Sequence, residues 1–435
     1  MTQSAHPERP LLPLHQLLTL SVYWFGIVAI WGGLNSVILP QRLDEIDPAR
    51  LGMLTAITVF AGAVAPILVQ PTIGNISDYT VSRWGRRKPY IVIGTLLDMA
   101  FLFGLASSNE FVSIVAFYFL LQFSSNFAQG PFQGYVPDLV PAGQVGMASG
   151  LMGTMIVLGT VGGIGIATTW AGGGEFFLPT IALGAVELLT MIILVFTVDE
   201  GRTAPARTRS WREIALSAWG RDILQQANLL WVLAVRLFFL AGYAATTFGI
   251  AYFMRSLGQT RAEANETFFI GTAIIGAATA LAAIPGGRLS DRFGRRPVIW
   301  AASGLAAGGL LGVAAAPSPA LAISSFVLFG LGMGTFLSVD WALMTDVIPK
   351  HTSGRYMGIL NAGTAMAQPV FLLVGGVALD LTGIFSGNPT DPLGPRVAMI
   401  VAALFVVAAG LALLKVDPRR REEGAAAVEP QPVPA

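Results

Sequence analysis

The sequence predicts an all-α membrane protein with twelve membrane-spanning helices arranged in two pseudo-symmetric bundles of six. More than half of its 435 residues are apolar and only 12% are charged, which is too little charged surface for a soluble chain of this length. Apolar runs of roughly 20 residues, long enough to cross a bilayer as helices, recur along the whole chain. Strands are not expected, because an open strand in lipid would leave backbone groups without hydrogen-bond partners.

The apolar runs place the spans, and the loops between them place the domains. We expect helices near residues 18–40, 51–73, 90–107, 111–136, 147–171, 178–198, 229–253, 267–287, 297–316, 320–343, 356–380 and 396–415. The longest connection falls midway along the chain. It divides the protein into a cytoplasmic segment 1–17, a first bundle 18–198, a linker with an interfacial helix at 199–228, a second bundle 229–415 and a disordered tail 416–435.

A basic loop recurs in the two halves. It reads GNISDYTVSRWGRRKPY at 74–90 and GGRLSDRFGRRP at 286–297, each time between two apolar runs. Equivalent positions in the two halves lie on the same side of the membrane, and most arginines and lysines outside the spans fall on that side. Because basic loops face the cytoplasm, we expect both termini to be cytoplasmic and the protein to lie in the inner (plasma) membrane, surrounded by the lipid bilayer.

Six spans repeated twice, with the repeated basic loop, resemble the major facilitator superfamily over nearly the whole chain. Within it, the long first loop ending in SRWGRRKPY resembles the glycoside–pentoside–hexuronide cation symporters. The plant sucrose symporters and the animal proton-associated sugar transporters share this loop pattern. The fourth span ends in NFAQGPFQGYVPDL at 126–139, which is similar to the sucrose-symporter pattern. The resemblance implies a monomer whose bundles rock around a central cavity lined by spans 1, 4, 7 and 10. It also implies a sugar or glycoside, such as sucrose or maltose, as the cargo.

Amide side chains form a stripe on the fourth span. Gln122, Asn126, Gln129 and Gln133 recur every three or four residues and therefore share one helical face. Amides donate and accept hydrogen bonds, which suits sugar hydroxyls, although amides also bond helix to helix in membranes. The other candidate substrate contacts lie on spans 1, 7, 10 and 11, where the aromatic ones could equally serve packing: Trp31, Asn35, Tyr243, Trp341 and Asn361.

Charged residues inside the membrane are costly and are therefore functional candidates. Arg236 on span 7 and Asp340 on span 10 lie at similar depths. We expect them to form an ion pair that gates or couples transport, with a static brace as the alternative. Asp98 on span 3 and Glu187 on span 6 both lie near mid-membrane. Since these spans are peripheral in the superfamily, the two acids form either a structural pair or a proton site.

The sequence departs from the resembled families at their coupling residues. The sucrose symporters carry an aspartate and an arginine where this chain has Gln122 and Gln133, and the melibiose-type sodium site uses acids where it has Gln70 and Gln129. Sodium coupling is therefore not expected, because hard cations prefer carboxylate oxygens. A coupled proton would need one of the three buried acids named above, and facilitated diffusion is the alternative.

The two basic loops also predict a cytoplasmic latch. Their aspartates can accept hydrogen bonds from helix N-termini, and their arginines can reach carboxylates at the inner ends of spans 4 and 10. Membrane topology alone would explain the arginines but not the repeated aspartates. We expect the latch to hold the cytoplasmic side shut when the cavity faces out, and its candidate members are Asp78, Arg83, Arg86, Arg87, Asp138, Asp291, Arg292, Arg295, Arg296 and Asp346.

Several other classes of protein are disfavoured. The chain has no cysteine, which excludes disulfides and cysteine–histidine metal sites, and its formal charge of +1 argues against nucleic-acid binding. No nucleophile–base pair or phosphate loop is recognisable, so we expect neither an enzyme nor a cofactor. The remaining alternatives are an efflux transporter for drugs or amphiphiles with the same fold, and a membrane scaffold or sensor without transport.

Overall fold

The computed structural model describes residues 11–141, 144–171, 173–200, 210–213, 226–347 and 364–417. Within these ranges the regular structure is helical and no strand occurs. Twelve helical segments are long and apolar enough to cross a membrane, which confirms the predicted fold class. They are Leu14–Ile46, Pro48–Asp78, Lys88–Ala106, Phe111–Gln133, Met147–Thr169, Phe177–Thr197, Ala227–Ser256, Arg261–Phe293, Arg295–Ala315, Pro319–Asp340, Thr364–Ser386 and Leu393–Lys415.

The individual helices follow the chain in a simple order. The first half consists of α1 (Leu14–Gly33), α2 (Leu39–Ile46), α3 (Leu51–Asp78), α4 (Lys88–Ala106), α5 (Phe111–Gln133), α6 (Tyr135–Leu139), α7 (Val145–Ala171) and α8 (Phe177–Thr197). The second half consists of α10 (Ala227–Tyr243), α11 (Gly249–Ala251), α12 (Arg261–Phe293), α13 (Arg295–Ala315), α14 (Pro319–Val347), α16 (Val377–Ser386) and α17 (Leu393–Ala412), with residues 364–371 also helical.

Several helices extend beyond the predicted spans. The second and eighth spans continue into the basic loops, because a helix that leaves the hydrocarbon core keeps its own backbone hydrogen bonds. The eleventh span is described from residue 364 to Ser386 rather than over 356–380, and residues 356–363 lie outside the described ranges. Of the predicted interfacial helix only the start is described: the amide of Ser210 donates to Glu213 Oε2 (2.9 Å) and the amide of Glu213 to Ser210 Oγ (3.2 Å), which is a capping box.

By its internal contacts the chain divides into two compact units. The first unit comprises Met1–Trp219, Thr246–Ala273 and Leu372–Ala398, and the second comprises Gly220–Ala245, Ile274–Phe371 and Met399–Ala435. The first unit thus includes segments from the second half of the sequence. The bundle boundaries 18–198 and 229–415 stay a prediction.

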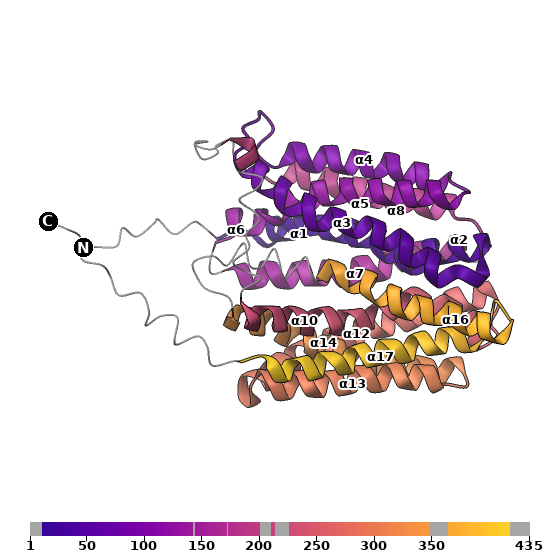
Figure 1. Cartoon of the computed structure of the whole chain (residues 1–435). Coiled ribbons are helices and arrows are strands. Elements are labelled where there is room, and N and C mark those ends of the chain that lie inside the picture. The colour runs from indigo at the N-terminus through magenta and orange to yellow at the C-terminus, as the bar shows by residue number, and fades with distance from the viewer. Residues whose placement is uncertain are drawn as a thin grey trace. The chain divides into compact units, whose positions relative to one another are not determined.

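Close helix packing organises the first unit. Helix α1 packs against α7 and α8, α4 packs against α5 and α8, and α3 packs against α5 (Figure 1). Glycines lie where these helices touch: a Cβ on Gly163 would come within 2.0 Å of the Ala29 carbonyl oxygen, and one on Gly94 within 2.8 Å of the Ser124 carbonyl oxygen. Small residues at these points let the backbones meet.

Three spans change to a π-helical turn part of the way along. The turns are Leu34–Ile38 in span 1, Tyr252–Ser256 in span 7 and Leu372–Gly376 in span 11. All three lie in the first unit. Such turns often mark functional positions because they redirect side chains and free backbone groups.

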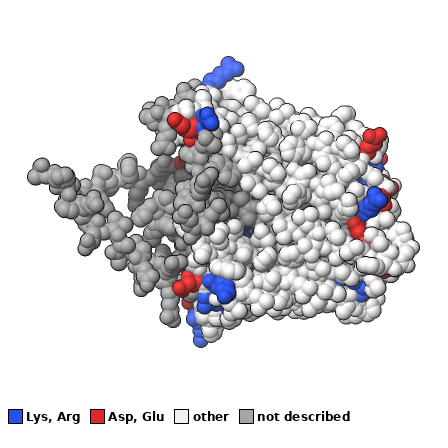
Figure 2. All heavy atoms as spheres, in the orientation of Figure 1, with Lys and Arg blue, Asp and Glu red and all other residues white. Residues whose placement is uncertain are grey.

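The second unit is held mainly by α13 against α14, with α10 also packing on α14. The rings of Phe239 on α10 and Phe336 on α14 stack with centroids 3.6 Å apart. On the face of the molecule drawn in Figure 2, the described charged side chains lie at the ends of the helices and leave an uncharged band between them. That distribution matches helices whose middle parts contact lipid.

Candidate functional site

A polar cluster joins α1 and α5 inside the first unit. The Tyr118 hydroxyl donates to Asn35 Oδ1 (3.1 Å), and Gln122 Nε2 donates back to that hydroxyl (3.2 Å). Asn126 Nδ2 bonds to the backbone oxygen of Gln122 (2.8 Å) and to its side-chain oxygen (3.2 Å). The Trp31 ring meets the Tyr118 ring edge-on, with centroids 6.1 Å apart. The π-helical turn at Leu34–Ile38 holds Asn35, so the kinked part of span 1 supplies one side of the cluster.

The remaining members of the amide stripe lie farther along α5. Gln70 on α3 donates to Gln129 Oε1 (3.1 Å), which makes Gln129 a helix-to-helix contact in this structure. Gln133 is half-buried at the last residue of α5. The stripe therefore divides into one part that bonds within the α1–α5 cluster and one part that bonds α5 to α3.

Three predicted substrate contacts belong to the second unit. Tyr243 is half-buried at the end of α10 and stacks on Phe329, with ring centroids 6.3 Å apart. Trp341 lies on α14, but its side chain lies outside what the structure describes, as does Asn361 as a whole. The role of these three residues as substrate contacts stays a prediction.

The second unit buries an ion pair. Arg236 on α10 bonds to Asp340 on α14, and the two side chains are only 6% and 1% exposed. The guanidinium also donates to Thr364 Oγ1 (2.7 Å) and contacts the Met344 sulfur (3.3 Å). The pairing expected from their depths along the helices is therefore present, and the additional partners reduce the cost of burying the arginine.

The first unit buries two acids together. Asp98 on α4 and Glu187 on α8 are 0% and 1% exposed, and the Tyr23 hydroxyl bonds both to Thr95 on α4 (2.6 Å) and to Glu187 on α8. Ser124 on α5 donates to Asp98, and the Tyr23 hydroxyl on α1 donates to Glu187 Oε1 (3.3 Å). The sequence placed both acids at mid-membrane, and the structure brings them together where four helices meet.

The first basic loop forms a compact charge cluster centred on Arg87. The Arg87 guanidinium bonds to Asp78 Oδ1 (2.6 Å), to Asp138 Oδ2 (2.7 Å) and to the Pro131 carbonyl oxygen (2.8 Å). Arg86 also bonds to Asp138. Arg83 does not join the cluster, because it is exposed and lies over the ring of its neighbour Trp84. These contacts bind the end of α3 and the end of the fourth span to one buried arginine.

Glu200 completes this cluster and was not among the predicted residues. Its carboxylate accepts hydrogen bonds from the backbone amides of Arg87 (3.0 and 3.1 Å) and Lys88 (3.0 Å), so it caps the N-terminus of α4. Gly85 makes room for it: a Cβ there would lie 2.1 Å from Glu200 Oε1, and its φ of +117° suits glycine. Burial raises the pKa of the nearby Tyr135 phenol, and the Glu200 carboxylate raises that pKa further.

The second basic loop is looser. Arg295 at the start of α13 bonds to Asp291 near the end of α12, four residues earlier in the chain (2.7 Å), and the Asp291 side chain is 73% exposed. Arg296 donates to the Val416 carbonyl oxygen, and Arg292 lies over the Phe293 ring. Gly294, with φ +88°, is the single residue between α12 and α13, so this loop has no room for the fold seen in the first copy. The side chain of Asp346 lies outside the described residues.

A buried carboxylate caps the N-terminus of α3, at the end of that helix opposite the Arg87 cluster. Asp380 on α16 is 7% exposed and accepts hydrogen bonds from the amides of Gly52 (2.8 Å) and Met53 (2.7 Å), which open that helix. The π-helical turn that precedes α16 brings Gly376 against Gly52, where a Cβ on Gly52 would lie 1.9 Å from the Gly376 oxygen. The negative charge is thus placed at the positive end of a helix dipole.

Further polar contacts join the two sequence halves at this same end. Arg255 bonds to Asp44, Arg261 bonds to Glu45 (2.6 Å), and Gln41 donates to Asn265 Oδ1 (2.7 Å). The Arg255 side chain is 6% exposed, whereas Arg261 and Glu45 are 26% and 34% exposed. This set of contacts was not among the residues predicted from the sequence. Two signals in the sequence could have predicted it. One is an acidic residue inside a span, and the other is a group of acids and arginines on loops predicted to lie on the same side of the membrane.

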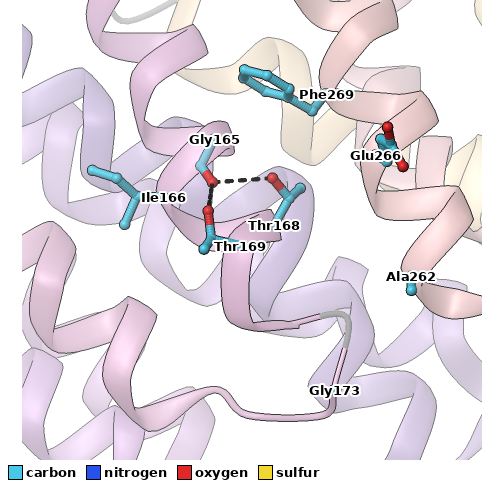
Figure 3. A pocket seen from close by; sticks show the side chains of 8 residues that line it. All are labelled: Gly165, Ile166, Thr168, Thr169, Gly173, Ala262, Glu266 and Phe269. Carbon is cyan, nitrogen blue, oxygen red and sulfur yellow. Dashed lines mark hydrogen bonds between the residues drawn. The ribbon is translucent and has the colours of Figure 1, made fainter.

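A separate cavity of about 720 Å³ lies between α7 and α12 in the first unit. Figure 3 shows its lining, with Phe269 and the exposed Glu266 on α12 across from Thr168 and Thr169 on α7, whose hydroxyls bond to the Gly165 carbonyl oxygen (3.1 and 2.8 Å). None of the predicted substrate contacts lines it.

Comparison with known proteins identifies the family of this chain. The sequence profile of the Major Facilitator Superfamily matches residues 17–279 and 232–435. The chain is 24% identical to lactose permease of Leuconostoc lactis over 305 residues, which is 61% of this chain and 46% of that protein. It is 30% identical to sucrose transport protein SUT1 of Oryza sativa subsp. japonica over 146 residues, or 27% of each chain. The matched part thus spans less than half the length of these two relatives.

The solved structure of the nucleoside transporter NupG has the same fold, with a TM-score of 0.70 and 14% identity over 92% of this chain and 98% of that one. At that identity the likeness concerns the fold alone. A shared fold does not determine what is carried. The resemblance inferred from the basic loops and the fourth span is confirmed by these matches.

Proposed function

We propose a function from one premise: the chain belongs to the Major Facilitator Superfamily, a family of membrane transporters. It carries a sugar or glycoside across the inner membrane by alternating access, with a proton as the coupling ion. It acts as a monomer with both termini in the cytoplasm. Relatives named for lactose and sucrose support the substrate class.

The observation that carries the substrate class is the α1–α5 cluster. Asn35, Tyr118 and Gln122 offer neutral donors and acceptors beside the Trp31 ring. A sugar presents both hydroxyls and an apolar ring face, so amides and an indole suit its two kinds of surface. The half-buried position of Asn35 and Gln122 favours exchange of their present hydrogen bonds for bonds to a solute.

Alternating access is supported by the contacts at the opposite end of α3. Asp380, Arg255, Arg261 and Asn265 belong to the second half of the sequence, whereas their partners belong to the first half. If the halves separate at that end, this whole set breaks at once. A set of polar contacts with two discrete arrangements is what a switch between two states requires.

The test is transport by the purified full chain in proteoliposomes. Uptake of radiolabelled sucrose, lactose, maltose and melibiose is measured with and without an inward proton gradient. We expect saturable uptake of at least one sugar, and its accumulation above equilibrium when the gradient is imposed. Extrusion of an amphiphile in place of sugar flux would assign the chain to efflux, and sugar binding without flux would assign it to sensing.

The site itself is tested by Gln122→Leu, which keeps the side-chain size and removes the amide. Loss of one hydrogen bond between neutral groups, about 0.5–1.5 kcal/mol, should raise KM roughly 2- to 10-fold. The matched control is Gln259→Leu, because that amide bonds to Thr267 Oγ1 (3.0 Å) away from the cluster. An equal change of KM in both variants would contradict the assignment of the cluster.

A further inference from the structure

Unlike the buried Arg236–Asp340 pair, Asp98 and Glu187 form no ion pair with a basic side chain among the described residues. One oxygen of each carboxyl accepts from a hydroxyl, of Ser124 for Asp98 and of Tyr23 for Glu187. The other oxygens, Asp98 Oδ2 and Glu187 Oε2, receive no hydrogen bond from a donor group among the described residues. Each carboxyl therefore has one buried oxygen that lacks a donor.

The surrounding helices supply no positive charge. Helix α5 and helix α7 contain no charged residue over Phe111–Gln133 and Val145–Ala171, and α8 contains only Glu187. Helix α1 contributes Tyr23 to the pair, while its His15 is exposed at the start of the helix. On α4 the single basic residue is Lys88, the first residue of the helix and ten positions from Asp98.

Two carboxylates buried side by side without a cation cannot both stay ionised, because each would lose its hydration and repel the other. A proton on one carboxyl removes one charge and supplies the donor that the facing oxygen lacks. The geometry therefore accommodates one proton between the two groups. By contrast, Asp340 bonds to the permanent charge of Arg236, which balances the negative charge of that acid without a proton.

The pair also has a mechanical connection to the proposed sugar site. Ser124 lies on α5 two positions from Gln122 and two from Asn126, which places it on the opposite face of that helix. The backbones of α4 and α5 touch behind it at Gly94, and a Cβ on Gly26 of α1 would lie 2.8 Å from Glu187 Cα. A change in the hydrogen bonds of the pair is thus passed directly to the helix that carries the amides.

We propose that Asp98 and Glu187 together form the proton-binding site that couples transport, and this proposal rests on the proposed function. On loading, a carboxylate oxygen of the pair forms an O–H bond with a proton delivered by water from one side. On release, that bond breaks and the proton passes to water on the other side, with no oxidation or reduction. The site lies on spans 3 and 6, outside the cavity-lining set 1, 4, 7 and 10, and Arg236–Asp340 remains a charge pair throughout.

The first test separates coupling from sugar binding. Asp98→Asn and Glu187→Gln keep the side-chain shape, and sugar counterflow without a gradient reports binding and rocking alone. We expect both variants to retain counterflow and to lose proton-driven accumulation, from up to about tenfold per pH unit for one proton per sugar to equilibration. Full accumulation in either variant would overturn the proposal, and so would sugar uptake by the unmodified chain that ignores the proton gradient.

A second test needs no sugar. Infrared difference spectra of the unmodified detergent-solubilised chain, recorded between low and high pH, should contain the carbonyl band of a protonated carboxyl that loses its proton. That band should vanish in the Asp98→Asn/Glu187→Gln double variant and persist in Asp340→Asn. A band that persists in the double variant would overturn the proton site. A band that behaves as expected, with no sugar flux in proteoliposomes, would leave the site standing and sink the sugar assignment.

Discussion

The hydrogen bonds between Asp380 and the start of α3 give the most direct test of how this end of the protein opens. The substitution Asp380→Asn keeps one acceptor oxygen but removes the negative charge. Two backbone amides now donate to the carboxylate, and in the variant one of them would face the NH2 group of the new side chain, which is itself a donor. Hydrogen bonds to charged groups contribute about 1.5–3 kcal/mol each. We take a loss of about 2 kcal/mol from the closed form, which lowers the ratio of closed to open protein roughly 30-fold.

The assay uses the natural absence of cysteine. A single Ala56→Cys reporter lies one helical turn beyond Gly52 on α3, at a position only 2% exposed. A membrane-impermeant maleimide added to intact cells reaches this thiol when the end opens, and the labelling rate follows the open fraction when opening and closing are fast. We expect Asp380→Asn to raise the labelling rate about 30-fold, in line with the population shift estimated above.

The control is Glu45→Gln, which makes the same carboxyl-to-amide change at the same end. Its ion pair with Arg261 is partly exposed, and such pairs contribute about 0.2–1 kcal/mol, so the rate should rise by no more than about fivefold. If the Asp380→Asn rate falls within the range of the Glu45→Gln rate, the buried carboxylate does not hold this end closed and the reasoning fails.

Three further predictions test the charge clusters. Arg87→Ala should cost about 1–3 kcal/mol, because it removes hydrogen bonds to two partly exposed carboxylates and leaves the buried Pro131 carbonyl oxygen without this donor. The exposed Arg83→Ala should change stability by under about 0.5 kcal/mol, and melting temperatures in detergent separate the two. Gly85→Ala should destabilise the loop by about 1–3 kcal/mol, because alanine disfavours the positive φ and its Cβ would clash with the Glu200 carboxylate that caps α4. The loop should then be cleaved faster by a protease, and an unchanged cleavage rate would contradict capping by Glu200. Asp340→Asn should lower the melting temperature by leaving Arg236 unpaired, and adding Arg236→Met should restore most of it; no recovery would mean that the pair is not the cause.

The spans and the first charge cluster could be predicted because their signals are local. Apolar length determines where a helix can cross lipid, and the basic loop repeats as a readable motif. Arg87 and Asp138 lie at the ends of adjacent spans, so their contact follows from connectivity. Glu200 could not be identified in the same way, because its partners are backbone amides and carry no residue signature.

Contacts that depend on the register between distant helices could not be read from the sequence. The π-helical turn in span 11 rotates the residues that follow it, so that Asp380 on α16 reaches Gly52. The residue pattern of the span does not predict such a turn. The Asp98–Glu187 pair could be predicted in part. The depth of each acid follows from its span, but the approach of α4 to α8 depends on packing at positions such as Gly184, where a Cβ would lie 2.8 Å from the Met99 sulfur.

The two ends of α3 differ in which parts of the chain they bind, and this changes the expected role of the basic loop. The partners of Arg86 and Arg87 among the described residues all belong to the first half of the sequence, so we expect those bonds to stay intact in the proposed alternating access. The bonds at the opposite end join one half to the other and must break when that end opens. Substitutions in the Arg87 cluster should therefore change stability more than the closed-to-open ratio, whereas substitutions at Asp380 should do the reverse. We therefore expect the first copy of the loop motif to brace a bundle, and any latching by it has to come from contacts beyond those that Arg86 and Arg87 make here.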